Sequence, residues 1–536
     1  MSSTGWGASD RVLAALLFAG VVAYLCRVPW GLGAADESYF LYEAKRLRDG
    51  EVMYRDVFQF VTPLASYAMA LLFWLFGTTI TTAHVAMAAL HGATAALLYA
   101  ASRRLGVRPV LSAVVALAHL VVCQAAWPHA SWHWFSALCA TAALCAMVGG
   151  AWVGRPRRAF IPGVIGGIAI GVQQQKGIVL AGGMGLVLVV DGLLDLWYRE
   201  RVCWRAWALR LAWFAGGVGL IVAPLLAVFL ALAGAETMYD ALVRFPLDTY
   251  GARFSTAWGT TTEFLDRSTY PVVLTYSPAV LAGSLAQWLW DVGRRQGRAL
   301  ARQLSAVIVL SGGAVLSAWY FPDVIHIAFI AGVFGVAAAQ NVERLLTAIC
   351  PAVLSRQAGL FVAVLIGFPL LSHLVSNASH LRRTYPVSHE TAFGRVDFTG
   401  AWEVNLVDQT RALLDRAPSR TLYSYPHYIS LYLTADARNP TRYQYFNASM
   451  SPPHHTDDVL RTLRTERLPY IIALLLMPRG DPVVRYIKDN YRVLPLPAQM
   501  GWYKAYGRKD LEEWREPSDA APGAVPEAQA AGQAPR

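Results

Sequence analysis

The sequence has little charge for its length. Of its 536 residues only 15% are Asp, Glu, Lys or Arg, whereas 55% are hydrophobic; soluble globular proteins carry about 25% charged residues. The apolar residues come in blocks of about 15 to 25 with almost no charge, a length that crosses a hydrocarbon core of about 30 Å. This composition excludes a soluble enzyme, a disordered chain and a collagen-like fibre.

Cysteine is also scarce. The six cysteines lie inside or beside apolar blocks, at Cys26, Cys123, Cys139, Cys145, Cys203 and Cys350. None is spaced as in a metal site, and the one large polar region has none. A disulfide-rich secreted scaffold is therefore excluded.

The apolar blocks predict a polytopic α-helical membrane protein with about eleven transmembrane helices. Predicted spans are residues 11–27, 82–101, 109–126, 131–152, 160–174, 177–197, 207–233, 270–290, 304–320, 324–341 and 357–375. The block from Pro63 to Phe76 has about 14 residues, which is short for a span. With Thr62 as N-cap, Pro63 at the first helical position and Gly77 as terminator, we expect an interfacial or re-entrant helix there.

The positive charge predicts the orientation. The formal net charge is +11, which in a soluble protein would suggest a nucleic-acid partner. If the Pro63 helix does not cross and the N-terminus is cytoplasmic, every arginine cluster between spans falls in the cytoplasm, as the positive-inside rule requires. We therefore expect no nucleic-acid partner, but a multi-pass plasma (inner) membrane protein with a cytoplasmic N-terminus and an exterior, periplasmic C-terminal domain.

The predicted organisation has three parts. Residues 1–375 form the transmembrane domain with a first exterior loop at 28–81, residues 376–510 form a small exterior α/β domain, and residues 511–536, rich in Ala, Pro and Gly, form a disordered tail. In the α/β domain, patterning predicts strands at Thr421–Pro426, Arg442–Phe446 and Tyr470–Met477, and helices at Trp402–Arg416, Thr456–Arg467 and Asp481–Tyr491.

A polar cluster in this domain has two interpretations. His454, His455, Asp457 and Asp458 are residue types that bind metals. Thr456 or Asp457 as the cap of the following helix is the simpler explanation, and it is the one we favour from sequence.

The first exterior loop opens with an acidic pair. The pattern predicts an amphipathic helix on the membrane, with Asp36 as N-cap, an apolar face that includes Phe40 and Ala44, and Gly50 as its end. A carboxylate fixed on such a helix has the rigidity that a general base or a metal ligand requires.

These residues carry a resemblance. Asp36-Glu37 followed by Tyr39, Ala44, Gly50, Tyr54, Asp56, Pro63 and Leu75-Phe76-Gly77 is similar to the first loop of integral-membrane glycosyltransferases that use polyprenyl-phosphate sugars. This GT-C-fold group includes the protein mannosyltransferases (glycosyltransferase family 39) and the lipid A aminoarabinose transferases. The resemblance is strongest over residues 10–200 and weak in the C-terminal domain.

The resemblance implies roles for these residues. Asp36 would be the catalytic base or a metal-linked carboxylate that activates the acceptor hydroxyl, with Glu37 and Asp56 as further candidates. The donor would be a polyprenyl-phosphate sugar, the acceptor a lipid, glycan or protein, and the lipid phosphate would leave as the sugar is attacked. No cofactor is certain, and a divalent cation is possible.

Other polar groups fall on the predicted exterior face. Lys176, in a polar turn between two spans, either holds the donor phosphate or extends to the headgroups. His133 stands where similar transferases carry a second acidic residue, and an imidazole does not replace a carboxylate's charge, which puts a metal-dependent mechanism in doubt. Asp323 and His326, three residues apart, share one face of a span's outer end.

Similar lipid A transferases have lysines just before Asp323, and this sequence has none there. The phosphate-binding role would then fall to Lys176, or to Arg244, Arg253 or Arg267 in the long exterior loop.

Two other functions stay open. A transporter or flippase for lipid-linked saccharide would be expected to show repeated halves, and none is visible. A surface-polysaccharide polymerase or ligase would depend on a large exterior loop with arginines, which the loop after residue 233 offers.

Overall fold

The structure is a computed structural model. It describes residues 7–29, 31–32, 35–198, 204–250, 278–295, 297–319, 322–426, 428–474, 480–498 and 500–510. The predicted tail at 511–536 lies outside the described residues.

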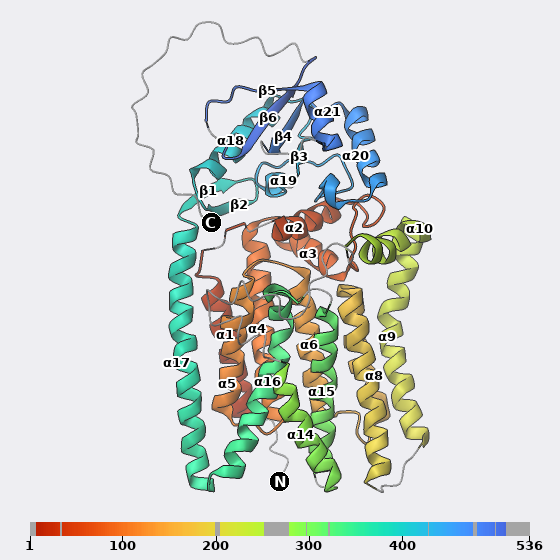
Figure 1. Cartoon of the computed structure of the whole chain (residues 1–536), viewed down its shortest axis with the longest axis vertical. Coiled ribbons are helices and arrows are strands. Elements are labelled where there is room, and N and C mark those ends of the chain that lie inside the picture. The colour runs from red at the N-terminus through yellow and green to blue at the C-terminus, as the bar shows by residue number, and fades with distance from the viewer. Residues whose placement is uncertain are drawn as a thin grey trace.

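The transmembrane part is a bundle of helices that run alternately up and down (Figure 1). Within the described ranges, nine segments are long and apolar enough to cross a membrane. They are α1 (Ala8–Leu25), α4 (Ile80–Arg104), α5 (Pro109–Ala118) with its short continuations to Ala126, α6 (Trp132–Gly149), α8 (Gln174–Trp197), α9 (Trp204–Ala233), α15 (Arg298–Ala318), α16 (Val324–Ile349) and α17 (Ala352–Thr384).

Two further apolar helices coincide with predicted spans. α7 (Phe160–Val172) has 13 residues and α14 (Ala279–Gly293) has 15. Both are short for a full crossing, and most of the loop before α14 lies outside the described residues. The polytopic helical fold is confirmed, while the number of eleven spans stays a prediction.

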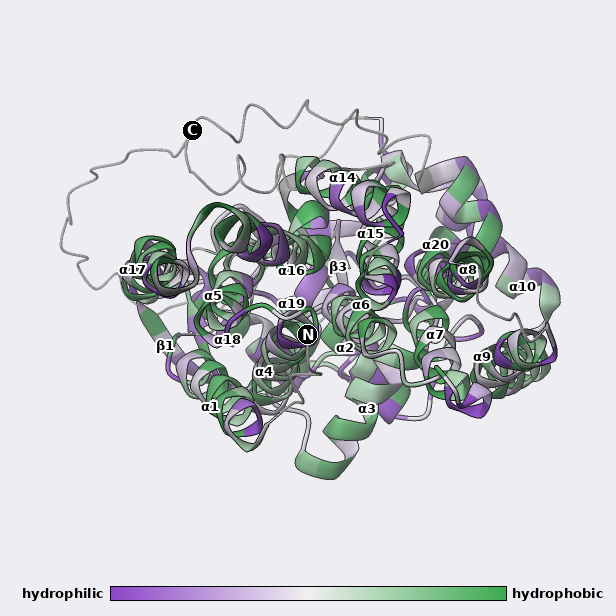
Figure 2. Ribbon diagram, turned by 90° about the horizontal axis from the view of Figure 1, so that it is seen from below, coloured by the Kyte–Doolittle hydropathy of each residue, from purple (hydrophilic) through white to green (hydrophobic). Residues whose placement is uncertain are grey.

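The outer surface of the bundle is apolar. Large hydrophobic side chains are exposed along the outer helices, as on α9 at Leu220 and Leu226 and on α17 at Phe361 and Phe368. Figure 2 shows the hydrophobic colouring of the helices around the bundle. A surface of this kind requires lipid around it.

The two ends of the bundle differ. The N-terminus lies at one end, and the C-terminal domain covers the other, where α17 enters it (Figure 1). Arginines near the N-terminal end are paired: Arg103 Nε lies 2.7 Å from an Asp10 oxygen, and Arg108 Nη2 lies 2.7 Å from Glu343 Oε1. Arginine-rich turns and the C-terminal domain are thus at opposite ends of the molecule.

Two helices of the first exterior loop lie between the bundle and this domain. α2 (Ala35–Arg48) begins one residue before the predicted cap, so Asp36 is in its first turn and the N-cap prediction is wrong. α3 (Leu64–Phe76) ends at Gly77, which has a φ of 90°. Thr62 does not cap α3 as predicted, because its hydroxyl donates to the carbonyl of Ile170 on α7 at 2.6 Å.

The position of α2 also differs from the prediction. Phe40 and Ala44 are buried as expected. The opposite face contacts the C-terminal domain instead of lipid: Tyr42 stacks on Tyr432 with centroids 4.7 Å apart, and Arg46 Nη1 donates to the carbonyl of Thr441 at 3.0 Å. The helix is therefore enclosed by protein on two sides.

The C-terminal domain is α/β, as predicted. Its four-stranded sheet has the order β3-β4-β6-β5, with β3 and β4 parallel and the other pairs antiparallel. The strands are β3 (Tyr423–Tyr425), β4 (Tyr470–Leu474), β5 (Tyr491–Val493) and β6 (Tyr503–Arg508), and a separate hairpin contains β1 (Val387–Thr391) and β2 (Gly394–Phe398). The helices are α18 (Ala401–Arg416), α19 (Ser430–Thr434), α20 (Pro453–Glu466) and α21 (Pro482–Asn490).

One predicted strand is absent from this domain. Arg442–Phe446 is irregular, because its backbone pairs with the first exterior loop and not with the sheet: the Phe58 amide donates to the Arg442 carbonyl at 2.8 Å. Capping by Thr456 or Asp457 is also wrong, since α20 begins at Pro453 and both residues lie inside it.

Candidate functional site

The first turn of α8 aims a lysine into the bundle. Gly177, in the same turn, permits the close approach of α7, because a Cβ atom there would lie 2.3 Å from the backbone of Ala169. The side chain of Gln174 bonds the backbone of residues 60 and 62, which ties the first exterior loop to α8. Lys176 Nζ lies 2.9 Å from His133 Nδ1 and 5.1 Å from the centre of the Phe329 ring.

His133 connects this lysine to α16. It is in the first turn of α6, where Ser131 caps the helix by accepting from the His133 amide. Its ring stacks on Phe329 at 4.5 Å and lies 5.4 Å from the ring of His326. Three helices thus bring Lys176, His133 and His326 together.

Asp323 and His326 form the pair that the sequence predicts. Asp323 is the N-cap of α16, and its Oδ1 atom accepts from the His326 backbone amide at 2.7 Å. The same oxygen lies 2.7 Å from His326 Nδ1. This double contact fixes the imidazole at the outer end of the span.

Asp36 faces this group from α2. Its side chain is exposed to solvent, yet protein surrounds the carboxyl closely enough that burial raises its pKa above the ordinary aspartate value. The charge of Asp323 raises the pKa further, while His326 and His129 act to lower it. Because the charges of Asp323 and His326 both act on the Asp36 pKa, Asp36 lies in the same polar cluster as these residues.

An apolar pocket opens beside Lys176 within the bundle. Small and aliphatic residues of five helices line it, with Lys176, Ser136 and Ser317 as its polar members. The remaining lining includes Ala137, Ala140, Val179, Leu180, Leu310, Gly313, Ala314, Phe329 and Ile330. The arrangement has a cation at one place and hydrocarbon-like walls elsewhere.

Glu37 is placed differently from Asp36. It is only 1% exposed, and its Oε1 atom accepts from the Ala130 amide at 2.7 Å and lies 3.3 Å from His84 Nε2. Its Oε2 atom lies 3.4 Å from His129 Nδ1. Burial alone would raise the Glu37 pKa, but the two histidines outweigh it and hold the pKa far below the ordinary value.

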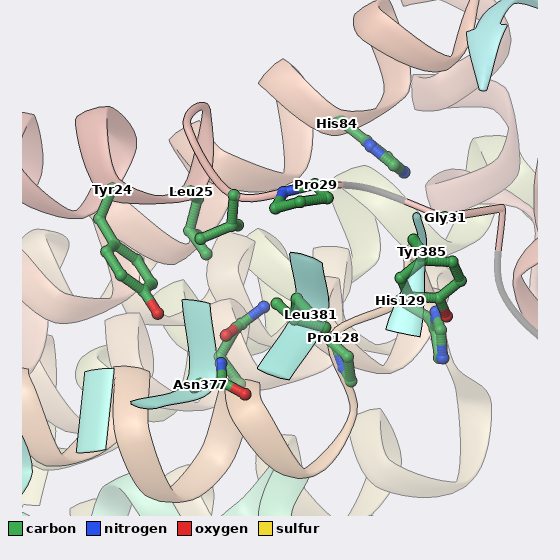
Figure 3. Close-up of a pocket in the computed structure, with 12 residues that line it drawn as sticks. Tyr24, Leu25, Pro29, Gly31, His84, Pro128, His129, Asn377, Leu381 and Tyr385 are labelled. Atoms are coloured by element: carbon green, nitrogen blue, oxygen red, sulfur yellow. The ribbon is translucent and has the colours of Figure 1, made fainter. Parts of the chain in front are cut away.

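Both histidine partners of Glu37 also line a small pocket of about 30 Å³ between α1, α4 and α17. Figure 3 shows His84 and His129 with Tyr385 and Gly31 around it. The Tyr385 ring packs against Gly31, where a Cβ would lie 1.9 Å from it. Glu37 therefore joins α2 to the 127–131 turn and to α4.

Two described sequence candidates, Asp56 and Arg244, are not brought to this cluster. Asp56 accepts from the Val52 amide at 2.8 Å and pairs with Arg55, which stabilises a turn and lowers its pKa. Arg244 pairs with Asp240 at 3.4 Å, beside a different cavity. Arg253 lies outside the described residues.

Several residues of the cluster were missed from sequence. His84 and His129 hold Glu37, and Phe329 packs on His133. Tyr445 comes from the C-terminal domain, and the charge of Asp36 adds to the effect of burial in raising its pKa. Only His129, beside the tryptophans of an exterior turn, had a sequence signal.

Metal-binding side chains gather at another place. Among the described residues, one group of three places ligand atoms within 4.8 Å of one another, and it consists of Asp240, His454 and His455. Asp36, Asp323 and His326 do not form such a group.

Comparison with known proteins identifies the fold. ArnT from Cupriavidus metallidurans bound to undecaprenyl phosphate superimposes with a TM-score of 0.60 at 14% identity, covering 94% of this chain and 98% of that one. The apo state of the same protein gives 0.58. The chain has the GT-C fold.

A second structure agrees. The archaeal oligosaccharyltransferase AglB from Archaeoglobus fulgidus, in complex with an inhibitory peptide and a dolichol-phosphate, gives a TM-score of 0.50 at 12% identity and covers 87% of this chain and 69% of that one. No protein-family model and no curated protein matches the sequence. At these identities the likeness establishes the GT-C fold and not the substrate.

Proposed function

We propose that this protein is an integral-membrane glycosyltransferase that moves a sugar from a polyprenyl-phosphate donor to an acceptor hydroxyl at the exterior face. The observation that carries this proposal is the meeting of Asp36 with Lys176, His133, Asp323 and His326 at one end of a GT-C bundle. The solved structures of this fold bind undecaprenyl phosphate or a dolichol-phosphate, which is the donor chemistry that the site suits.

Asp36 is the proposed base. It is open to solvent on a rigid helix, and its raised pKa gives the carboxylate more affinity for a proton than an ordinary aspartate has. The carboxylate would take the proton of the acceptor hydroxyl as that oxygen forms its bond to the anomeric carbon. The bond from the anomeric carbon to the phosphate oxygen breaks, and the lipid phosphate leaves with the electron pair.

Lys176 is the proposed partner of that phosphate. Its ammonium stands at an apolar pocket that suits the first isoprene units, and it contacts His133 at 2.9 Å. A cation that is already in place stabilises negative charge as it develops on the leaving oxygen.

The remaining groups position these two. Asp323 fixes the His326 imidazole, which lies near both His133 and Asp36. Glu37 is buried, so we assign it to holding the 127–131 turn against α2 and not to contact with substrate.

The Asp36→Asn variant tests the proposal. The amide keeps the shape of the side chain but takes no proton, so sugar transfer by the purified protein should fall by about 10² to 10⁴-fold. Asp49→Asn, at the exposed residue after the same helix, is the matched control and should keep full activity. Transfer by Asp36→Asn at the unmodified rate would contradict the base role.

A separate outcome tests the class of function. If the purified protein moves lipid-linked saccharide across vesicle membranes and transfers no sugar to any lipid, glycan or protein acceptor, the transporter alternative is favoured and the glycosyltransferase proposal fails.

A further inference from the structure

The exterior loop after α9 meets the C-terminal domain at a cluster of two histidines and an aspartate. α10 (Ala235–Tyr239) leads into a π-helical segment, η4 (Asp240–Tyr250), whose first residue is Asp240. His454 and His455 are in the first turn of α20. Their Nε2 atoms each lie 3.8 Å from Asp240 Oδ2.

We propose that Asp240, His454 and His455 bind a divalent transition cation of the Zn²⁺ class and thereby link the exterior loop to the C-terminal domain. Two imidazoles and a carboxylate are a donor set that suits zinc. Bonds of about 2.0 to 2.2 Å in tetrahedral geometry place neighbouring ligand atoms roughly 3.4 Å apart. The two histidine–aspartate separations of 3.8 Å need to close by a few tenths of an ångström, and all three ligand atoms lie within 4.8 Å of one another.

The least mobile ligand is already held in place. The His455 side chain is 4% exposed, and its ring is enclosed by three aromatic rings, at 4.7 Å from Phe58, 4.6 Å from Tyr443 and 5.8 Å from Phe245. This packing fixes Nε2 in its direction toward Asp240. His454 is 59% exposed, so its imidazole has the freedom to close on an ion.

The surroundings suit a bound ion with one open position. Asp240 Oδ1 lies 3.4 Å from Arg244 Nη1, which orients the carboxylate while Oδ2 faces the histidines. A cavity of about 340 Å³ borders the group, and its charged lining includes Glu236 and Asp458 as well as Arg244, Arg442 and Arg461. Water from this cavity can occupy the fourth position.

The consequence is a cross-link between segments more than two hundred positions apart in the chain. The same interface between the exterior loops and the C-terminal domain contains the backbone hydrogen bond from Phe58 to Arg442. A metal at Asp240 would therefore stabilise the C-terminal domain over the bundle, separately from the cluster around Asp36.

Metal content tests this proposal directly. The full-length protein in detergent, stripped with a chelator and dialysed against ZnCl₂, should retain a single zinc ion per chain by mass spectrometry of the metal. MgCl₂ in place of ZnCl₂ should leave the chain without metal. The Asp240→Asn and His454→Gln variants change partly exposed ligands and should each weaken zinc binding at least tenfold in competition with a chromogenic chelator.

His389→Gln is the matched control. His389 is a partly exposed histidine of the same domain that pairs with the carboxylate of Asp408 at 2.9 Å, so its loss should leave zinc binding unchanged. The thermal midpoint should rise with ZnCl₂ in the unmodified chain and in His389→Gln, but not in Asp240→Asn. Substoichiometric zinc in the unmodified chain, or zinc binding unaltered by Asp240→Asn and His454→Gln together, would overturn the proposal.

Discussion

Lys176 Nζ and His133 Nδ1 lie 2.9 Å apart, on two helices that enter the bundle from the same end. If Lys176 carries an ammonium, which has donors only, then Nδ1 accepts at this distance and the imidazole is neutral. The positive charge of the lysine is then held in a fixed direction beside the apolar pocket. A phosphate that binds there finds the cation already oriented.

The Lys176→Gln variant should lose affinity for the donor. A hydrogen bond to a charged group contributes about 1.5 to 3 kcal/mol, which corresponds to a rise of roughly 10 to 100-fold in the KM for the polyprenyl-phosphate sugar. The KM for the acceptor should change little. Initial rates with each substrate varied in turn separate the two constants.

Lys45→Gln is the control for that experiment. Lys45 is on α2 and pairs with Asp49 and Asp436 at the surface, so both constants should be kept. If the acceptor KM of Lys176→Gln rises as much as its donor KM, Lys176 does not act specifically on the donor phosphate, and the proposed role is wrong.

Glu37→Gln should destabilise the protein. The buried carboxylate interacts with the Ala130 amide, His84 and His129, and the neutral amide loses the charge in these interactions. We expect a loss of roughly 1 to 3 kcal/mol in the free energy of unfolding at neutral pH, with a lower kcat and a nearly unchanged donor KM.

The pH dependence of this loss has a definite sign. Because the folded-state pKa of Glu37 is depressed, its contribution is complete above the unfolded value of about 4.3 and is lost as the pH falls below it. Thermal unfolding of both proteins should therefore give midpoints that differ at pH 7 and converge in acid. A constant difference across this range would show that the carboxylate charge is not what stabilises the turn.

The residues that the sequence could identify are those with a local signal. Lys176 interrupts an apolar stretch, Asp36 follows the first span, and Asp323 precedes a span by one residue. Hydropathy indicated these positions, and the family resemblance supplied the role of Asp36. That they lie together follows from the alternation of the spans, which puts their ends on the same side.

The contacts of the C-terminal domain had no such signal. The segment 442–446 has strand-like residues, yet its backbone partner is Phe58 in a loop almost four hundred residues earlier. The cluster of Asp240, His454 and His455 likewise forms only because α20 packs against η4. This packing is tertiary, so the periodicity of the sequence does not indicate it.

Glu43 gives the opposite pH dependence from Glu37. It is a fully buried residue of α2, with Gln59 Nε2 donating to its Oε2 atom at 2.5 Å, and burial raises its pKa to about 7. The folded state therefore favours the protonated acid, and stability should fall as the pH rises from about 4.3 to about 7, after which the loss is complete. The total corresponds to roughly 4 kcal/mol.

Glu43→Gln removes this titration. The thermal midpoint of the variant should exceed that of the unmodified protein at pH 8 and approach it at pH 5, in the same detergent and buffer ionic strength. A midpoint that falls equally at both pH values would mean that the ionised carboxylate contributes to stability and would contradict the raised pKa.

The orientation in the membrane is a prediction from the charge of the two ends, and it is open to a direct test. With Cys26, Cys203 and Cys350 changed to serine, a single cysteine is introduced at exposed Glu466 on α20 or at exposed Arg157 between α6 and α7. The arginine-rich turns should be cytoplasmic, so a membrane-impermeant maleimide added to intact cells should label Glu466→Cys and not Arg157→Cys.

After the cells are permeabilised, both variants should be labelled to a similar extent, which shows that each thiol is accessible. Labelling of Arg157→Cys alone in intact cells would place the C-terminal domain in the cytoplasm, and with it the cluster around Asp36.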